Sequence, residues 1–485
     1  MNPSNRHVVF PQLFVICLVA TATSLCAAAA PRPHILFILA DDLGWGDVGF
    51  HGSPIKTPTL DALAASGARL EQFYVQPVCT PTRAALLTGR YPMRHGLQVE
   101  VVRPWAQYGL PLEERTLAHA LREAGYETAL CGKWHLGHHQ PEYLPTRRGF
   151  DHQYGHYNGA IDYFTHERDG GHDWHRNDRA CYDEGYSTFL LADEAARIIR
   201  RHDPKKPLFL YLPFNAVHSP FQAPKEYVEP YVQMTEPRRT YAGMVTAMDD
   251  AVGRVIAALN EKRMRRDTLI VFASDNGGPA PGRITSNGPY RAGKGTLYEG
   301  GVRVAAFATW EGHIPAGTVV REPLHIVDWY PTLLKLAGAS LEQKLPLDGR
   351  DAWPTIAEGK PSPHEQILVN AAPASGALVA REWKPVPASG AILVGQWKLV
   401  INGLAATGET NPQPRKELVE LFHLADDPSE KNNLADRFPD KVRQLRTRYD
   451  ALAQQGIPPK FQPKPPGFQS PKVWGELVSP QVTNP

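Results

Sequence analysis

The chain has 485 residues, and its 52 lysines and arginines nearly balance its 50 aspartates and glutamates. This balance excludes the strong global field that would favour nucleic acid or an anionic membrane as a partner, so any attraction for an anionic ligand has to be local. The length favours two compact parts, a large α/β domain and a smaller companion.

The first 30 residues have the pattern of a secretory signal peptide. A short polar start precedes an apolar run at 8–22, too short to span a membrane, and small residues suited to cleavage follow, near Ala28–Pro31. Removal leaves Cys79, Cys131 and Cys181, too few for a disulfide framework, and a bridge between the last two has no positive support. We therefore expect a secreted or periplasmic bacterial protein whose mature chain has no membrane span.

Four apolar runs predict parallel strands that are buried on both faces, and each run ends near polar side chains. In chain order they are 34–40 before Asp41 and Asp42, 127–131 before Lys133 and His135, 207–214 before His218, and 268–274 before Asp275 and Asn276. Each polar group alone is more simply interpreted as a turn cap or a solvated loop residue. Because open α/β sheets bind ligands outside the carboxyl ends of their strands, four such groups together indicate one shared cleft.

The remaining elements of the first 360 residues complete an α/β pattern. Helices are predicted at 57–66, 81–88, 116–124, 187–202 and 241–262, and further strands at 68–75 and 304–310. A glycine-rich loop at 290–303 holds Lys294, but it lacks P-loop spacing and is weak evidence for phosphate binding. The pattern predicts a large, mostly parallel central sheet flanked by helices.

The helix predicted at 81–88 places a cysteine at its amino end. Pro81 suits a first helical position, and Gly89 ends the helix. Cys79 would then lie where unpaired backbone N–H groups and the helix dipole favour an anion, with Arg83 adding a fixed charge one turn in. The alternative is an ordinary buried cysteine and a surface arginine, and this motif alone does not decide between the two.

The pattern changes from residue 361 onward. Antiparallel strands are predicted at 392–401 and 418–424, and an amphipathic helix at 440–453, which together indicate a smaller C-terminal α+β domain with an antiparallel sheet. The predicted division is a signal peptide at 1–30, a catalytic domain at 31–360, an α+β domain at 361–457 and a proline-rich tail, extended over the surface, at 458–485.

Six separated motifs resemble the signature of the sulfatase family. They are LADDLGWGD at 39–47, CTPTR at 79–83, GKWHLG at 132–137, VHSP at 217–220, DNGG at 275–278 and GKGTLYEGGVR at 293–303. In that family the first cysteine of CTPTR is oxidised to formylglycine (3-oxoalanine), and Thr82 stands where the family usually has serine. Within the family, the segments at 144–151, 162–167 and 208–224 look most like the arylsulfatase B (N-acetylgalactosamine-4-sulfatase) branch.

The resemblance implies a calcium ion, or alternatively magnesium, as a cofactor. The ligands it implies are Asp41, Asp42, Asp275, Asn276 and the modified Cys79. The aspartates and the asparagine offer the oxygen donors that these hard cations prefer. Three carboxylates against a divalent ion leave one net negative charge, so a sulfate ester needs compensating cations. The residues that can supply them are Arg83, Lys133, His135, His218 and Lys294.

The resemblance also implies a catalytic sequence. The hydrated formylglycine at position 79 carries two hydroxyls, one of which attacks sulfur with help from the metal and Arg83. His218 and Lys294 bind the sulfate and protonate the leaving oxygen. His135 then takes a proton from the second hydroxyl, so that the aldehyde re-forms and sulfate leaves.

The sequence therefore predicts an enzyme that hydrolyses sulfate esters on carbohydrate, matured by a formylglycine-generating or anaerobic sulfatase-maturating enzyme. One alternative is a phosphomonoester or phosphonate-ester hydrolase of the same fold, and another is a non-catalytic sulfated-glycan binder with unmodified Cys79. Five further residues lie in segments that could line the entrance, with structural roles as the alternative: Arg147, Arg148, Asp162, Tyr163 and His166.

Overall fold

A computed structural model describes most of the chain that follows the predicted signal peptide. The described residues are 32–373, 375–379, 382–386, 388–403 and 417–476. The predicted signal peptide at 1–30 lies outside them, as does the end of the predicted tail, 477–485. Within the described part of the chain, none of the helices combines the length and apolarity that a membrane span requires.

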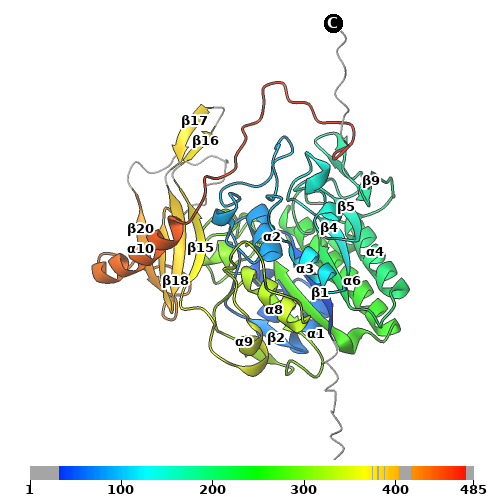
Figure 1. Ribbon diagram of the computed structural model, residues 1–485, viewed down its shortest axis with the longest axis horizontal. Helices are drawn as coiled ribbons and strands as arrows, with labels where there is room; N and C mark the ends of the chain where they lie inside the picture. Colours follow the sequence, from blue (N-terminus) through cyan, green and yellow to red (C-terminus); the bar gives the residue numbers. More distant parts are fainter. Residues whose placement is uncertain (1–31, 374, 380–381, 387, 404–416, 477–485) are drawn as a thin grey trace, which may run out of the picture. The chain divides into compact units, whose positions relative to one another are not determined.

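Ten strands form one central sheet (Figure 1). In spatial order they are β13 (Thr318–Val320), β2 (Ala68–Leu70), β12 (Ala306–Thr309), β11 (Thr268–Ser274), β1 (His34–Ala40), β10 (Leu208–Pro213), β4 (Glu127–Lys133), β5 (His152–His156), β8 (His175–Arg176) and β9 (Arg179–Ala180). The strands from β11 to β5 are parallel, whereas β12 and β8 join them antiparallel. The four strands predicted to end in polar groups are therefore neighbours.

Helices cover both faces of this sheet, as two separate hydrophobic cores show. One face carries α2 (Cys79–Thr88), α3 (Leu117–Glu123) and α8 (Trp329–Leu336), and the other carries α1 (Pro58–Ala65), α4 (Ser187–Arg201) and α6 (Arg238–Glu261). Along β1, Phe37 belongs to the first core and its neighbour Ile38 to the second, because successive strand residues point to opposite faces. The predicted α/β class with a mostly parallel sheet is confirmed.

The C-terminal part forms a second sheet of four antiparallel strands (Figure 1). They are β15 (Ile367–Ala372), β18 (Ser389–Val394), β19 (Trp397–Ile401) and β20 (Val419–His423), and α10 (Pro439–Ala453) packs against them. Leu445 and Tyr449 of α10 are buried against this sheet. The predicted antiparallel sheet with one helix is therefore present; the domain boundaries at 360 and 457 stay a prediction.

Three elements differ from the sequence predictions. The single strand expected at 68–75 is two short strands, β2 and β3 (Phe73–Tyr74), and β3 pairs with β14 (Leu324–His325) in a separate two-stranded sheet. The strand expected at 392–401 is the hairpin of β18 and β19, because Gly395 has a φ of 57° and supplies the turn. Apolar residues on both sides of each break favour one strand in a sequence-based assignment, although Glu71 and Gln72 interrupt the first run and Gly395 and Gln396 the second.

The helix expected at 81–88 begins two residues earlier, at Cys79. Val78 is extended (φ −147°, ψ 165°) and stands outside the helix, and Gly89 ends it in the left-handed region (φ 67°). Pro81 is the third residue of the helix and not, as predicted, the first. Proline is tolerated there because the backbone N–H groups of the first turn have no helical partner. Cys79 therefore belongs to the first turn of α2.

A buried ion cluster fastens the C-terminal sheet to the loop that carries Lys294. Lys398 on β19 is fully buried, and its Nζ lies 2.8 Å from both Glu299 Oε1 and Glu430 Oε1. Glu299 opens the short helix α7 (Glu299–Val302) directly after that loop, and its backbone N donates to Glu430 Oε2 at 2.6 Å. The second sheet thus stabilises the position of a loop in the first.

Lys398→Ala is expected to lower the free energy of unfolding by about 3–5 kcal/mol, because it leaves Glu430 buried without a cation and Glu299 with Arg303 alone. The measurement is thermal and urea-induced unfolding. Lys225→Ala is the matched control: its side chain is 87% exposed and pairs only across one helical turn with Glu229, so the change should be below about 1 kcal/mol. Equal stability of the two variants would show that the cluster does not hold the sheets together.

Candidate active site

The polar ends of four adjacent strands meet at one edge of the central sheet. Asp41 follows β1, and Asp275 follows β11, its backbone N donating to Ala40 O at 2.9 Å. Val217, in the loop after β10, donates its N to Asp41 O at 2.7 Å, and Lys133 is the last residue of β4. The parallel register thus brings residues more than 200 positions apart into contact.

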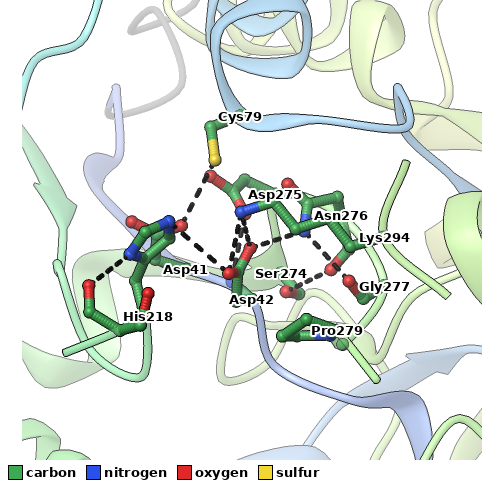
Figure 2. Close-up of polar contacts among 12 residues, drawn as sticks. Asp41, Asp42, Cys79, His218, Ser274, Asp275, Asn276, Gly277, Pro279 and Lys294 are labelled. Carbon is green, nitrogen blue, oxygen red and sulfur yellow. Dashed lines mark hydrogen bonds and ion pairs between the residues drawn. The ribbon is translucent and has the colours of Figure 1, made fainter. Parts of the chain in front are cut away.

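Three carboxylates in this cluster are each paired with a cation from a different element. The pairs are Arg83 of α2 with Asp275 (Nη2–Oδ2 2.9 Å), Lys133 of β4 with Asp41 (Nζ–Oδ2 2.6 Å) and Lys294 of the glycine-rich loop with Asp42 (Nζ–Oδ2 2.8 Å; Figure 2). Arg83 also donates through Nη1 to Lys133 O at 3.0 Å. Arg83 is fully buried, so the simpler interpretation of it as a surface charge is wrong.

The donor set of this cluster fits a divalent cation. Asn276 Oδ1 is buried and has no hydrogen-bond partner among the described residues, while its amide nitrogen donates to Asp42 Oδ1 at 2.8 Å. Burial, together with the charge of Asp275, raises the pKa of Asp41 to about 7, so these two effects outweigh the opposite effect of Lys133 and Arg83 on this carboxyl. Carboxylate and amide oxygens in this arrangement suit calcium or magnesium.

Cys79 points into the cluster from the first turn of α2 (Figure 2). Its Sγ lies 3.5 Å from Asp41 Oδ1, and it belongs to a group with Asp41, Asp42 and His218 whose ligand atoms all lie within 4.8 Å of one another. Burial and the nearby Asp275 raise the pKa of the thiol, so an unmodified Cys79 stays neutral and is a poor nucleophile. The position suits an oxygen nucleophile beside hard ligands.

His135 lies across the cavity in an unusual backbone conformation, with a φ of 58°. Its backbone N donates to Tyr157 O at 3.0 Å, and its Nδ1 is buried without a partner among the described residues. Any Cβ at Gly159 would lie 2.4 Å from the His135 ring, so glycine is required there. Burial, followed by the charge of Lys133, lowers the pKa of His135 well below its usual value and keeps the ring a neutral proton acceptor.

His218 is fixed by its backbone and by one ring nitrogen. Its Nδ1 bonds with Ser219 O at 2.6 Å, which leaves Nε2 facing Asp42 Oδ2 at 3.6 Å. Tyr163 donates its hydroxyl to His218 O at 2.7 Å. Burial and the charge of Lys294 lower the pKa of His218 to about 3. An anion bound beside Nε2 would raise that pKa, so the ring can gain a proton when a sulfate ester enters.

A cavity of about 540 Å³ opens over this cluster. Cys79, Asp42, His135, His218 and Lys294 line its floor, whereas Arg83 and Lys133 are fully buried behind the carboxylates. The wall includes residues that sequence reasoning missed: Glu100, Val101, Val102, Arg103, Pro104, Ala160, Arg168, Phe221 and Ile284. Apart from Phe221, which lies in the segment 208–224, they lie outside the strand ends and the motifs, so a single sequence carries no signal for them.

Four of the five residues considered for the entrance have structural contacts, and the fifth is exposed. Arg148 is 2% exposed and donates through Nη2 to Pro111 O and Glu114 O, both at 3.0 Å. Tyr163 supports the His218 loop, and His166 bonds with Gly185 O at 3.1 Å. In the same way, Asp162 accepts from the backbone N of Phe164 and of Thr165, and Arg147 is an exposed residue outside the cavity lining.

The two other described cysteines take no part in this site. Cys131 is buried in β4, Cys181 is half-buried, and both are free. No bridge joins them in the described residues.

Comparison with known proteins identifies the family. The sulfatase family profile matches residues 33–339, most of the chain. The chain belongs to the sulfatase family. It is 40% identical to mouse (Mus musculus) arylsulfatase J, over 92% of this chain and 81% of that protein, and 33% identical to mouse N-acetylgalactosamine-6-sulfatase, over 86% and 85%. This sulfatase is accordingly a sulfuric ester hydrolase.

A solved structure agrees with this assignment. The crystal structure of Ps i-CgsB in complex with k-i-k-neocarrahexaose superposes with a TM-score of 0.78 at 32% identity, covering 89% of this sulfatase and 94% of that chain. The match spans both sheets, since it extends well beyond the region that the family profile covers.

Calcium is expected to stabilise this sulfatase more at about pH 8 than at about pH 5.5, because Asp41 must lose its proton before its carboxylate can bind a cation. Without metal, Asp41 has a higher pKa in the folded than in the unfolded protein, so its protonated form stabilises the fold. This stabilisation is complete at low pH and is lost as the pH rises through about 7. Calcium at about 100 times its Kd adds about 2.7 kcal/mol. The measurement is thermal unfolding in EDTA and in calcium.

The difference between the unfolding temperatures in calcium and in EDTA, taken at each pH, reports on this site alone. Burial also raises the pKa of Glu430 to about 7, but Glu430 contributes equally to the unfolding temperature in both solutions. Asp275→Asn should abolish the calcium effect. A calcium-induced shift of the same size at both pH values would contradict the assignment of Asp41 as a ligand.

Proposed function

We propose that this sulfatase removes sulfate from sulfated carbohydrate of the N-acetylgalactosamine 4-sulfate type. The nucleophile would be a formylglycine made from Cys79, with calcium, or alternatively magnesium, held by Asp41, Asp42, Asp275, Asn276 and residue 79. The observation that carries this proposal is the neutral thiol of Cys79, 3.5 Å from Asp41 Oδ1 at the floor of the cavity. It gives the chain an acidic, oxygen-rich site with no competent nucleophile until residue 79 is modified.

The proposed formylglycine and cation would each supply defined chemistry. A hydrated formylglycine supplies a hydroxyl nucleophile and a second hydroxyl through which the aldehyde can be regenerated. A divalent cation supplies a positive charge that polarises a sulfate oxygen and favours an ionised nucleophile. With Arg83, Lys133 and Lys294 already balancing the three carboxylates, a bound dication would make the cluster net positive, which suits an anionic ester.

Lys294 and His218 are the residues proposed to bind the sulfate and to protonate the leaving oxygen. Both line the cavity floor, and Asp42 raises the pKa of Lys294 so that it stays charged. His218 Nε2 faces the same space and gains a proton most easily when an anion lies beside it. The pair can therefore neutralise the ester oxygens and supply one proton to the departing alcohol.

His135 is proposed as the base that accepts the proton of the second hydroxyl. Its neutral ring, held against Gly159 with Nδ1 unpartnered among the described residues, can accept a proton without first losing one. Arg83 and Lys133 would act from behind, by fixing the positions of Asp275 and Asp41.

The substrate class rests on the names of related proteins and on the cavity. One relative is named N-acetylgalactosamine-6-sulfatase, and a structure of similar fold is a complex with a neocarrahexaose. The cavity wall holds Arg103, Arg168 and Phe221, a mixture of charged and aromatic side chains suited to a sulfated sugar. A formylglycine-generating or anaerobic sulfatase-maturating enzyme would be the partner in maturation, and the amino-terminal pattern supports secretion or a periplasmic location.

Cys79→Ala is expected to abolish sulfate-ester hydrolysis, because no other residue at the cavity floor can supply the nucleophile. Cys181→Ser, which changes a half-buried free cysteine outside the site, is the matched control and should keep full activity. Intact-mass analysis of the wild type should show residue 79 lighter by the change from thiol to aldehyde, a gain of one oxygen with loss of one sulfur and two hydrogens. A fully active enzyme with an unmodified cysteine would contradict the proposed nucleophile.

Hydrolysis of 4-nitrophenyl sulfate is expected to exceed that of 4-nitrophenyl phosphate, because the chain belongs to the sulfatase family. The measurement is kcat/KM for both, followed by a panel of chondroitin 4-sulfate, chondroitin 6-sulfate, dermatan sulfate and carrageenan oligosaccharides. A higher kcat/KM on the phosphate would favour the phosphoester alternative. Tight binding of the oligosaccharides without turnover, with cysteine retained at position 79, would favour the non-catalytic binder.

A further inference from the structure

Thr80 connects the position of the proposed nucleophile to the proposed base. It is the second residue of α2, directly after Cys79, and its side chain is fully buried. The hydroxyl donates to His135 O at 2.9 Å and accepts from Val102 N at 3.1 Å. Cys79, His135 and Val102 all line the catalytic cavity. One buried hydroxyl therefore joins the first turn of α2 to two other parts of the cavity.

Asp173 holds His135 from the opposite direction, through the bend that follows β5. Its carboxylate is fully buried: Oδ1 accepts from Tyr157 N at 2.9 Å, and Oδ2 accepts from the backbone N and from Nδ2 of Asn158 at 2.8 and 2.9 Å. Tyr157 O in turn accepts from His135 N at 3.0 Å. Gly159, the next residue of the bend, packs against the His135 ring. One carboxylate thus fixes the segment that contacts both the backbone and the ring of His135.

The hydrogen bonds of Asp173 are made by an ionised carboxylate. Burial alone would raise the pKa of this carboxyl, but the nearby His175 and His156 and the backbone N–H donors outweigh burial and lower it. Hydrogen bonds to an ionised acceptor are about twice as strong as those between neutral groups. His135 depends on such contacts, because its φ of 58° is a left-handed conformation that a histidine keeps only where its surroundings hold it.

We propose that Thr80 and Asp173 are positioning residues that hold His135 at a fixed place relative to residue 79. The proposal rests on the proposed function, because it takes His135 to be the base of that reaction. Neither side chain lines the cavity, so both act through His135. The residues proposed to bind the sulfate lie on other loops. Loss of either contact therefore lowers the rate of turnover more than the affinity for the substrate.

The test of Asp173 is a double-mutant cycle with His135. Asp173→Asn keeps the shape of the side chain and removes its charge, and it is expected to lower kcat on 4-nitrophenyl sulfate about tenfold, with KM changed less than about twofold. In a His135→Ala background the same substitution should lower kcat less than about twofold, because the residue that Asp173 positions is already gone. Asp249→Asn is the matched control: Asp249 is 2% exposed, accepts from the backbone N of Thr59 and of Leu60, and lies outside the cavity lining.

The test of Thr80 uses rescue by a conservative variant. Thr80→Val keeps the shape but cannot hydrogen-bond, and it is expected to lower kcat about tenfold, whereas Thr80→Ser should stay within about twofold of the wild type. Thr88→Val is the matched control, because Thr88 is fully buried in the same helix and its hydroxyl also donates to a carbonyl, Ala84 O at 2.7 Å. Since residue 80 lies beside the cysteine to be modified, kcat is divided by the modified fraction from intact-mass analysis.

Amide hydrogen exchange supplies a readout that does not depend on turnover. In a Cys79→Ala background, Asp173→Asn should speed exchange of the peptide that contains His135 about tenfold, and Asp249→Asn should leave it unchanged. Equal falls in kcat with and without His135, a failure of Thr80→Ser to restore kcat, or unchanged exchange would overturn the positioning role. A fully active His135→Ala variant would instead contradict the proposed function, and the exchange rates would still decide whether Asp173 holds His135.

Discussion

The repulsion among three carboxylates buried at the ends of β1 and β11 is the constraint on which this sulfatase depends. Asp41, Asp42 and Asp275 are at most 3% exposed, so water does not screen them from one another. Their charge is offset by three cations that arrive from α2, β4 and the glycine-rich loop. The site is therefore assembled only when three separate parts of the catalytic fold are in place.

The basic residues of the site fall into two groups, according to the atoms that each side chain faces. Arg83 and Lys133 are fully buried and direct their donors to carboxylates and to a backbone carbonyl, so they fix the ligands. Lys294 and His218 approach Asp42 from the cavity side, where a substrate can reach them. The cluster therefore has an inner layer of buried ion pairs, in which the charges balance, and an outer layer of side chains that line the cavity.

The C-terminal part of the chain contributes to the catalytic part in two places. Lys398 pairs with Glu299, in the glycine-rich loop that also holds Lys294, and the segment 458–476 is hydrogen-bonded to Trp105 and to Arg168, which lines the cavity. The first contact affects the position of a charged group, and the second affects the shape of the surface beside the site. A small domain appended to a large sheet therefore takes part in the geometry of the site.

Elements with a local signal could be predicted from the amino-acid sequence. The uniform apolar runs of β1 and β11 and the glycine that ends α2 were predicted, because burial on both faces and a left-handed cap each require particular residue types. The polar residues at the strand ends were predicted to share one cleft, because ligands bind outside the carboxyl ends of the strands in open α/β sheets. The burial of Arg83, the cavity wall at Arg103 and Arg168, and the hydrogen bond from Trp474 to Arg168 became apparent from the folded structure alone. These depend on contacts between distant parts of the chain, for which the residues themselves carry no local pattern.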